Sequence, residues 1–149
     1  MPQFDQEKMV KLTSELRKSL MRLESLAKLD QAQFAADPDK SASAKYHFIV
    51  AIEACIDMCN HVISRNGYRV PEDYGDTFVV MGEVGALDGD FAAELKNTAK
   101  FRNRLVNLYW AVDDGQLFDI LQGRLGDFKR FLDSMAKFLA WHNQKPAEL

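Results

Sequence analysis

Apolar residues recur at helical spacing along most of the chain, and they predict a protein built from helices. Between residues 5 and 28, leucines and a methionine fall three or four positions apart with charged residues between them, which predicts an amphipathic helix. Residues 116–142 carry the most regular repeat, and its apolar positions are Phe118, Leu121, Leu125, Phe128, Leu132, Met135 and Leu139. No segment alternates with a period of two for long enough to form a strand. The fold class is therefore all-α.

The second predicted helix spans residues 41–66 and ends at Gly67, which serves as its C-cap. It is apolar or small on nearly every side. Only one narrow strip stays polar, formed by Glu53, Asp57, Asn60 and His61. A helix of this kind is usually central and packs against several neighbours. In so small a protein it also favours packing against a second copy, so we expect a homodimer.

The remaining segments complete an up-and-down bundle of four long helices and one short helix. Residues 30–37 form one short turn, and Pro38 then breaks the chain because the residue before a proline disfavours helix. A short helix is predicted over residues 76–84. A long helix follows from an aspartate N-cap and runs to about residue 112, where an Asp-Asp-Gly sequence breaks it. We expect residues 1–149 to form a single domain.

The composition is that of an ordinary globular protein. Of 149 residues, 47% are hydrophobic, and 19 basic against 22 acidic residues give a net charge of −3. Apolar runs are short and the first residues lack the basic-then-apolar pattern of a secretory signal, so we expect a cytoplasmic protein without a membrane span. Cys55 and Cys59 lie four apart on one helix, which suits neither a disulfide nor a complete zinc site. We interpret them as buried free thiols.

One segment is locally basic although the whole chain is acidic. Residues 95–112 contain no acid, and their four basic residues are Lys96, Lys100, Arg102 and Arg104. Within one continuous helix, Arg102 and Tyr109 are seven apart and share a face, whereas Asn103 and Asn107 share another. Such residues hold a phosphate and stack a base in nucleic-acid sites. The alternative is a solvated basic face with a structural tyrosine.

The polar strip of the second helix is a further candidate. Glu53, Asp57 and His61 follow one another at intervals of four. Buried carboxylates need partners, and the arginines of the basic helix are the natural ones. A metal site is the alternative reading, but one helical strip converges poorly on an ion. We interpret His47 and His142 as ordinary histidines.

The sequence from Phe101 to Asp113, FRNRLVNLYWAVD, resembles the signature of the HepT-like family of HEPN ribonucleases. Members of that family are toxins of HepT–MntA toxin–antitoxin pairs. Their motif is an arginine, four residues, a histidine, one residue and a tyrosine. The sequence AIEACIDMCNHVIS from Ala51 and the sequence GYRVP from Gly67, with Tyr74 and Phe78 after it, resemble the family too.

The resemblance implies a metal-independent RNA endonuclease that needs no cofactor and acts at a cleft between two copies. A nucleotidyltransferase antitoxin neutralises such a toxin by adding AMP to the motif tyrosine, which is Tyr109 here. Arg102 then holds the scissile phosphate. The supporting or RNA-binding residues are Asn103, Arg104, Lys100, Glu53, Asp57 and His61.

The chain departs from the motif at one position, because Asn107 stands where the family has histidine. Histidine transfers protons near neutral pH, whereas an amide does not titrate there. General acid–base catalysis contributes typically about 10²–10⁴-fold. The alternative function is therefore a weakened or inactive member that serves as binding or substrate subunit of the nucleotidyltransferase. His61 compensates only if the fold brings it to Arg102, and a helical bundle with an unrelated interaction role is the third hypothesis.

Overall fold

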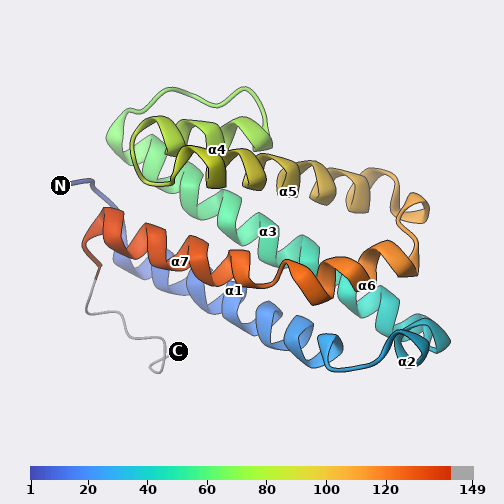
Figure 1. The fold of residues 1–149 in the computed structure, drawn as a ribbon. Coiled ribbons are helices and arrows are strands. Elements are labelled where there is room, and N and C mark those ends of the chain that lie inside the picture. The colour runs from blue at the N-terminus through green and yellow to red at the C-terminus, as the bar shows by residue number, and fades with distance from the viewer. Residues whose placement is uncertain (142–149) are drawn as a thin grey trace.

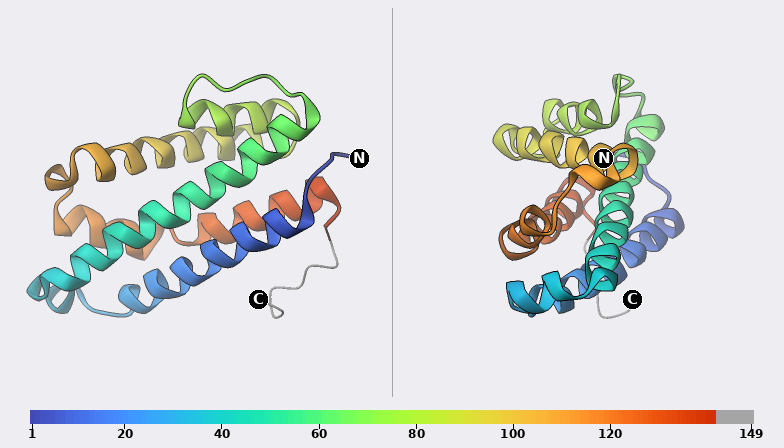
Figure 2. Two further views of the ribbon diagram at one scale, coloured as in Figure 1. Left: turned by 180° about the vertical axis from the view of Figure 1, so that it is seen from behind. Right: turned by 90° about the vertical axis from the view of Figure 1, so that its right-hand side faces the viewer.

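The computed structural model describes residues 1–141, and within them the chain forms helices and no strand. Figure 1 shows α1, α3, α5 and the α6–α7 pair lying across the picture, with successive members running in opposite directions. Figure 2 shows the same arrangement from behind and from one end. The helices are α1 Gln6–Ala27, α2 Gln31–Ala36, α3 Pro38–Asn66, α4 Tyr74–Glu83, α5 Gly89–Asn107, α6 Asp114–Gly123 and α7 Gly126–Leu139. The predicted all-α bundle is confirmed.

The first half of the chain matches its prediction closely. α1 and α3 pack against each other along their length, and Gly67 ends α3 in the left-handed conformation (φ 64°) as its C-cap. Two expectations were wrong. Residues 31–36 form a helix rather than a turn, because Asp30 and Gln33 complete a capping box. α3 begins at Pro38 rather than three residues later, since proline fits the first helical position, where no backbone donor is needed.

α4 lies antiparallel on the first part of α5 and leaves the second part uncovered (Figure 1). The two helices approach closely, because a Cβ built on Gly82 would lie 2.9 Å from the Cβ of Ala92. At the other end of α4, Gly75 lies against the side chain of Lys96. The part of α5 after Lys96 therefore extends beyond α4.

α5 ends at Asn107, earlier than predicted, and a 3-10 turn covers Tyr109–Ala111. The chain must turn here because Asp113 caps the next helix, its side chain accepting a hydrogen bond from the backbone N–H of Gln116. The buried Lys45 fixes the turn from α3 by donating to the carbonyl oxygen of Tyr109 at 3.2 Å. The spacing of apolar residues in the sequence does not indicate this contact between Lys45 and Tyr109.

The single last helix expected from the apolar repeat is two helices, α6 and α7. The break lies at Arg124 and Leu125, between Gly123 and Gly126. Glycine costs helix stability because the unfolded chain loses more freedom there, and two glycines three apart allow the bend. The apolar repeat continues across it, since Leu121 and Phe128 are both buried. The predicted end of this helix, including His142, lies outside the described residues.

α3 is the core helix. It is the one helix of the described chain long and apolar enough to cross a membrane by composition, but 61% of its most apolar stretch is buried against the other helices. Cys55 and Cys59 are buried free thiols, as predicted. Burial raises the pKa of both thiols well above the usual range, so they stay protonated and unreactive.

Candidate functional site

The centre of the site is an ion pair between α5 and α3. The Nε and Nη2 groups of Arg102 both donate to one carboxylate oxygen of Glu53, with an Nε–oxygen distance of 2.9 Å. The Nη1 group donates to the side-chain oxygen of Asn103 at 3.0 Å. The Arg102 side chain is 15% exposed and that of Glu53 is 40% exposed. The predicted pairing of the α3 acids with an arginine of the basic helix is confirmed at Glu53.

This arrangement fixes the guanidinium without using all of its donors. A guanidinium has five N–H groups, and three of those of Arg102 have acceptors among the described residues. One N–H therefore remains on each terminal nitrogen. Two parallel N–H groups are the geometry with which arginine binds phosphate oxygens. Tyr74 at the start of α4 covers one face of the group, with the guanidinium carbon 4.8 Å from the ring centroid.

Tyr109 lies in the turn after α5 and contacts the start of α3. The ammonium nitrogen of Lys45 lies 4.0 Å from the ring centroid of Tyr109 and also donates to its backbone carbonyl. The prediction that Arg102 and Tyr109 share a face of one helix is wrong, because the helix ends at Asn107. Glu53 and Lys45 are eight residues apart on α3, which corresponds to about 12 Å along the helix. Sequence reasoning also missed Lys45 and the contact of Tyr74 with Arg102.

A polar face of α5 lies beside the ion pair. Lys96, Lys100, Asn103 and Asn107 are spaced by four, three and four residues, so they share one side of the helix. Lys96, Lys100 and Asn107 are exposed and Asn103 is half-buried. The amide of Asn107 makes no hydrogen bond within residues 1–141. Arg104, one turn after Lys100, lies at the edge of this side and donates long hydrogen bonds of 3.4 Å to the backbone carbonyl of Ala111 and the side-chain oxygen of Gln116.

The histidines do not join this site within the described residues. Nε2 of His61 accepts a hydrogen bond from the backbone N–H of Asp5 at 2.8 Å, so this side chain ties α3 to the start of α1. Nδ1 of His47 pairs with the hydroxyl of Ser19 at 3.3 Å. His61 therefore does not lie at Arg102, and it does not replace the motif histidine that is missing at position 107.

Asp57, the middle member of the acidic strip, forms no ion pair among residues 1–141. Partial desolvation, and then the nearby Glu53 carboxylate, raise the pKa of Asp57. No group of three histidine, cysteine or acidic side chains converges on a metal position in this part of the chain. The three residues of the strip therefore do not act together. Glu53 forms an ion pair with Arg102, His61 accepts a hydrogen bond from Asp5, and Asp57 is exposed at the surface.

Large apolar side chains are exposed around the end of α5. We call Val106, Leu108, Tyr109 and Trp110 the α5 end patch; Trp110 is 78% exposed and Tyr109 46%. Val106 lies one helical turn after Arg102 and so borders the ion pair. On α3, Tyr46 is 61% exposed next to Lys45, whereas most other large apolar residues of that helix are buried. The apolar surface available to a partner therefore lies mainly on this patch rather than along α3.

Residues 16–135 match the family described as "Ribonuclease HepT-like". Among curated proteins, the chain is 26% identical over 104 residues to the mRNA nuclease HepT of Shewanella oneidensis, covering 70% of this chain and 78% of that protein. The Arg102 site lies inside the matched region. The match therefore spans four-fifths of the chain and includes every element that builds the site.

Solved structures share the fold. A tri-AMPylated Shewanella oneidensis HEPN toxin in complex with MNT antitoxin aligns with a TM-score of 0.80 at 22% identity, over 87% of this chain and 97% of that chain. The Bacillus subtilis protein YutE, a cytosolic protein of unknown function, aligns with a TM-score of 0.81 at 19% identity, over 97% of both chains. At this identity the two structures show the architecture alone. From the family match and the site it encloses, we conclude that the chain belongs to the HepT-like ribonuclease family.

Proposed function

We propose that this protein is the toxin of a toxin–antitoxin pair, an RNA endonuclease that works without metal and is neutralised by a nucleotidyltransferase antitoxin. The observation that carries the proposal is the held guanidinium of Arg102. Glu53 and Asn103 take three of its N–H groups and leave two directed away from them. Arg102 binds the scissile phosphate through these two groups. The Shewanella relative is described as an mRNA nuclease, which supports RNA as the substrate.

The basic face of α5 supports the same substrate. Lys96 and Lys100 are exposed on the side of α5 that also carries Asn103, the acceptor of Arg102, and they supply positive charge in an otherwise acidic chain. Positive charge of this kind attracts the phosphate backbone and makes binding sensitive to salt. Asn103 and Asn107 add amide groups that donate to and accept from the RNA. Such a protein acts where RNA is present, and we propose the cytoplasm; the structural relative YutE is described as cytosolic.

The active form is a homodimer. The α5 end patch exposes four large apolar side chains, of which Val106 lies one helical turn after Arg102, and Tyr46 and Tyr74 add two exposed aromatic rings from α3 and α4. A cluster of exposed apolar side chains commonly marks an interface in soluble proteins. A two-fold interface brings the same patch of both copies together. It therefore places two Arg102 groups on either side of one cleft.

Tyr109 is the residue that the antitoxin modifies. Its ring is half-exposed and held on the ammonium group of Lys45, which presents the side chain at a fixed place in the turn after α5. The structural relative from Shewanella is a tri-AMPylated toxin bound to its MNT antitoxin. A bulky anionic group on Tyr109 would occupy the cleft and repel RNA. Modification at this position therefore blocks the nuclease.

A second function is favoured by one observation. Asn107 replaces the motif histidine, and His47 and His61 are committed to Ser19 and Asp5. No histidine of residues 1–141 therefore stands ready to move a proton at Arg102. The second candidate is a member with little cleavage activity that binds RNA and serves as the substrate of the nucleotidyltransferase.

The test is cleavage of a fluorescently labelled RNA by the purified chain in the presence of EDTA. Cleavage is expected in the wild type and is expected to fall about 100-fold or more in Arg102→Ala, since the charged phosphate contact is lost. Arg102→Lys is not expected to restore it, because an ammonium group cannot bridge Glu53 and a phosphate in the same plane. Arg65→Ala, at an exposed arginine in the last turn of α3, is the control. Equal rates in Arg102→Ala and wild type would contradict the proposal, and no cleavage with intact RNA binding would favour the second candidate.

A further inference from the structure

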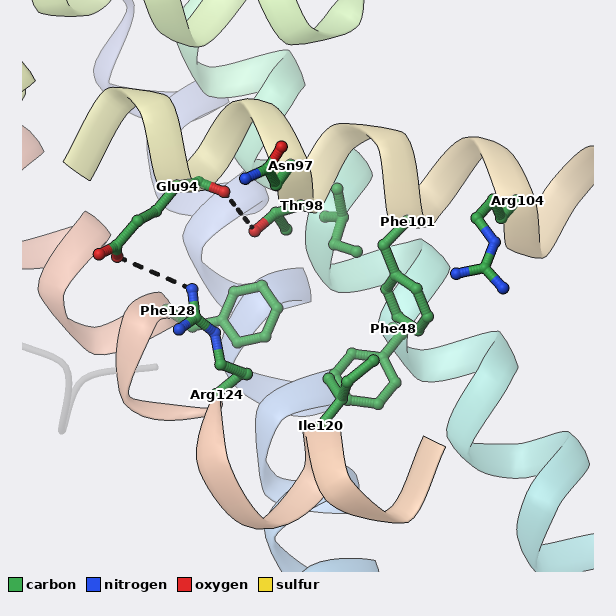
Figure 3. Close-up of a pocket in the computed structure, with 10 residues that line it drawn as sticks. Phe48, Glu94, Asn97, Thr98, Phe101, Arg104, Ile120, Arg124 and Phe128 are labelled. Carbon is green, nitrogen blue, oxygen red and sulfur yellow. Dashed lines mark hydrogen bonds and ion pairs between the residues drawn. The ribbon is translucent and has the colours of Figure 1, made fainter. Parts of the chain in front are cut away.

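A groove separates α5 from α6 and α7, on the side of α5 away from the Arg102 site. Figure 3 shows it as a cavity lined by aromatic and aliphatic side chains, which come from the four helices α3, α5, α6 and α7. Its volume is about 350 Å³, which is within the range of small-ligand pockets. The apolar lining consists of Phe48, Ile52, Phe101, Ile120 and Phe128. The proposed nuclease function uses none of these side chains.

The floor of the groove is aromatic, and Phe101 is its partly exposed ring. The rings of Phe48 and Phe101 meet edge to face with centroids 5.6 Å apart, and Phe101 extends into the cavity from α5 (Figure 3). Phe128 and Ile120 close it from α7 and α6. Aromatic floors of this kind stack planar rings, because every nucleobase has a π-face.

The rim of the groove is polar and carries two arginines at opposite ends (Figure 3). Arg124 already pairs with Asp127 at 3.1 Å and with Glu94 at 3.7 Å. Arg104 has no carboxylate partner within residues 1–141 and makes two hydrogen bonds of 3.4 Å to neutral oxygens. A half-buried guanidinium without an acid is suited to an anionic ligand. The anion-binding end of the groove is therefore the Arg104 end.

The rim also offers groups that read the edge of a base. Asn97 is exposed, and its amide has both donor and acceptor groups without a partner in the described part of the chain. The hydroxyl of Thr98 donates to the backbone carbonyl of Glu94 at 3.3 Å and keeps its lone pairs as acceptors. An aromatic floor, an amide at the edge and a cation without a carboxylate partner at one end together suit a nucleotide.

We propose that this groove binds one nucleotide unit, with the base on the phenylalanine floor and the phosphate on Arg104. The site is distinct from the Arg102 site, since two residues of helix separate the arginines by about 200° around α5. The nucleotide has two possible sources, a free mononucleotide or one residue of an RNA strand. Lys100 lies one turn before Arg104, so a strand on the basic face of α5 passes the mouth of the groove.

The experiment measures binding to the full-length chain by calorimetry, with two probes. One probe is the four mononucleotides AMP, GMP, CMP and UMP. The other is a 2′-O-methyl hexanucleotide, which cannot be cut by attack of its own 2′-hydroxyl. Arg104→Gln is expected to weaken the binding of either probe about tenfold, the effect of losing a charge-assisted hydrogen bond. Ile120→Trp fills the groove with a larger side chain, so it is expected to abolish the binding of mononucleotides by excluding the base.

The control is Lys129→Gln on α7, because Lys129 lies next to Phe128 in sequence but pairs with Glu24 of α1. It is expected to leave both affinities unchanged, and helical content by circular dichroism verifies that each variant folds. Binding of mononucleotides identifies a free nucleotide as a ligand, whereas binding of the hexanucleotide alone identifies an RNA residue. The proposal is overturned if neither probe binds, or if Arg104→Gln and Lys129→Gln weaken binding equally. RNA cleavage is measured in a separate assay. If the protein cuts RNA but the groove does not bind nucleotides, the groove proposal is wrong and the proposed nuclease function is unaffected.

Discussion

The ammonium group of Lys45 lies under the ring of Tyr109, 4.0 Å from its centroid, and donates a hydrogen bond to the carbonyl of the same residue. One side chain thus holds both the ring and the backbone of the turn that ends α5. Lys45 is only 7% exposed and has no carboxylate partner within residues 1–141. A buried ammonium group is costly unless it is well hydrogen-bonded, so its interactions with Tyr109 account for its presence.

Replacement of this lysine is therefore expected to release the turn without unfolding the bundle. In Lys45→Met the side-chain volume is kept and a buried charge is removed, so the free energy of unfolding is expected to change by less than about 1 kcal/mol. The cation–π interaction and the hydrogen bond that hold the turn itself contribute about 1–3 kcal/mol. Limited chymotrypsin cleavage after Tyr109 and Trp110, followed by mass spectrometry, is expected to speed up by about tenfold or more.

The control for this experiment is Lys40→Met, the same substitution at an exposed lysine in the first turn of α3. It is expected to leave the cleavage rate at the wild-type level. Equal rates for Lys45→Met and wild type would show that the turn does not depend on the lysine.

Restoring the motif histidine is expected to raise nuclease activity. Asn107→His places an imidazole on the exposed face of α5, where it titrates near neutral pH and transfers a proton. The expected gain in the initial rate of RNA cleavage is about 10²–10⁴-fold, with a pH profile that bends near about 6.5. Ala93→His, at an exposed position at the far end of the same helix, is the control. A gain in both variants, or in neither, argues against a catalytic role for position 107.

The α5 end patch is expected to hold two copies together. Val106→Glu puts a charge into the proposed interface beside Arg102, where it has no room for its hydration shell. Size-exclusion chromatography with light scattering is expected to give about 34 kDa for the wild type, twice the chain mass of 17.0 kDa, and the monomer mass for the variant. Met21→Glu, at an exposed apolar residue of α1, is the control and is expected to remain dimeric. A monomeric wild type contradicts the proposed cleft.

His61 makes the stability of the fold depend on pH in one direction. Burial, and then the charges of Lys8 and Arg65, lower the pKa of His61 below 6.5. The folded protein thus binds this proton less readily than the unfolded chain does, so the stabilising contribution is full above about pH 6.5 and is lost as the pH falls through the lowered value. Protonation also removes the acceptor for the backbone N–H of Asp5.

Urea unfolding at pH 7.5 and pH 5.5 tests this dependence. The wild type is expected to lose more stability on acidification than His61→Gln, whose amide oxygen accepts the same hydrogen bond but does not titrate. His47→Gln is the comparison at a second histidine with a lowered pKa. Identical losses in the wild type and His61→Gln would exclude His61 as the source.

Much of the fold was predictable because helix signals are local. Gly67 ends α3 where the sequence places a C-cap. The need of a buried carboxylate for a cation predicted a pair between the acidic strip and an arginine of the basic helix, and the structure shows this pair at Glu53 and Arg102. The end of α5 and the split of the last helix were not predictable from periodicity. An apolar repeat reports which positions are buried, and these positions stay buried whether or not the backbone bends between Gly123 and Gly126.

The candidate site was predictable only in part, for a related reason. Arg102, Asn103 and Tyr109 were found from their sequence pattern, but the contact of Lys45 with Tyr109 and that of Tyr74 with Arg102 were not. In the sequence, Lys45 lies among small and polar residues, Ser41, Ser43 and His47 among them, so its surroundings do not indicate burial. The remaining local signal is that no acid lies within four residues of Lys45 on its helix, so no ion pair of helical spacing is available to it at the surface.

The contact between Gly82 and Ala92 has an effect far from its own position. It is so close that a methyl group on Gly82 has no space unless α4 slides or tilts on α5. Tyr74, whose ring covers the guanidinium of Arg102, is the first residue of α4, and Gly82 lies near the end of the same helix. The packing of Gly82 on Ala92 therefore fixes the position of the Tyr74 ring over the guanidinium, about two helical turns away, and Gly82→Ala is expected to shift that ring.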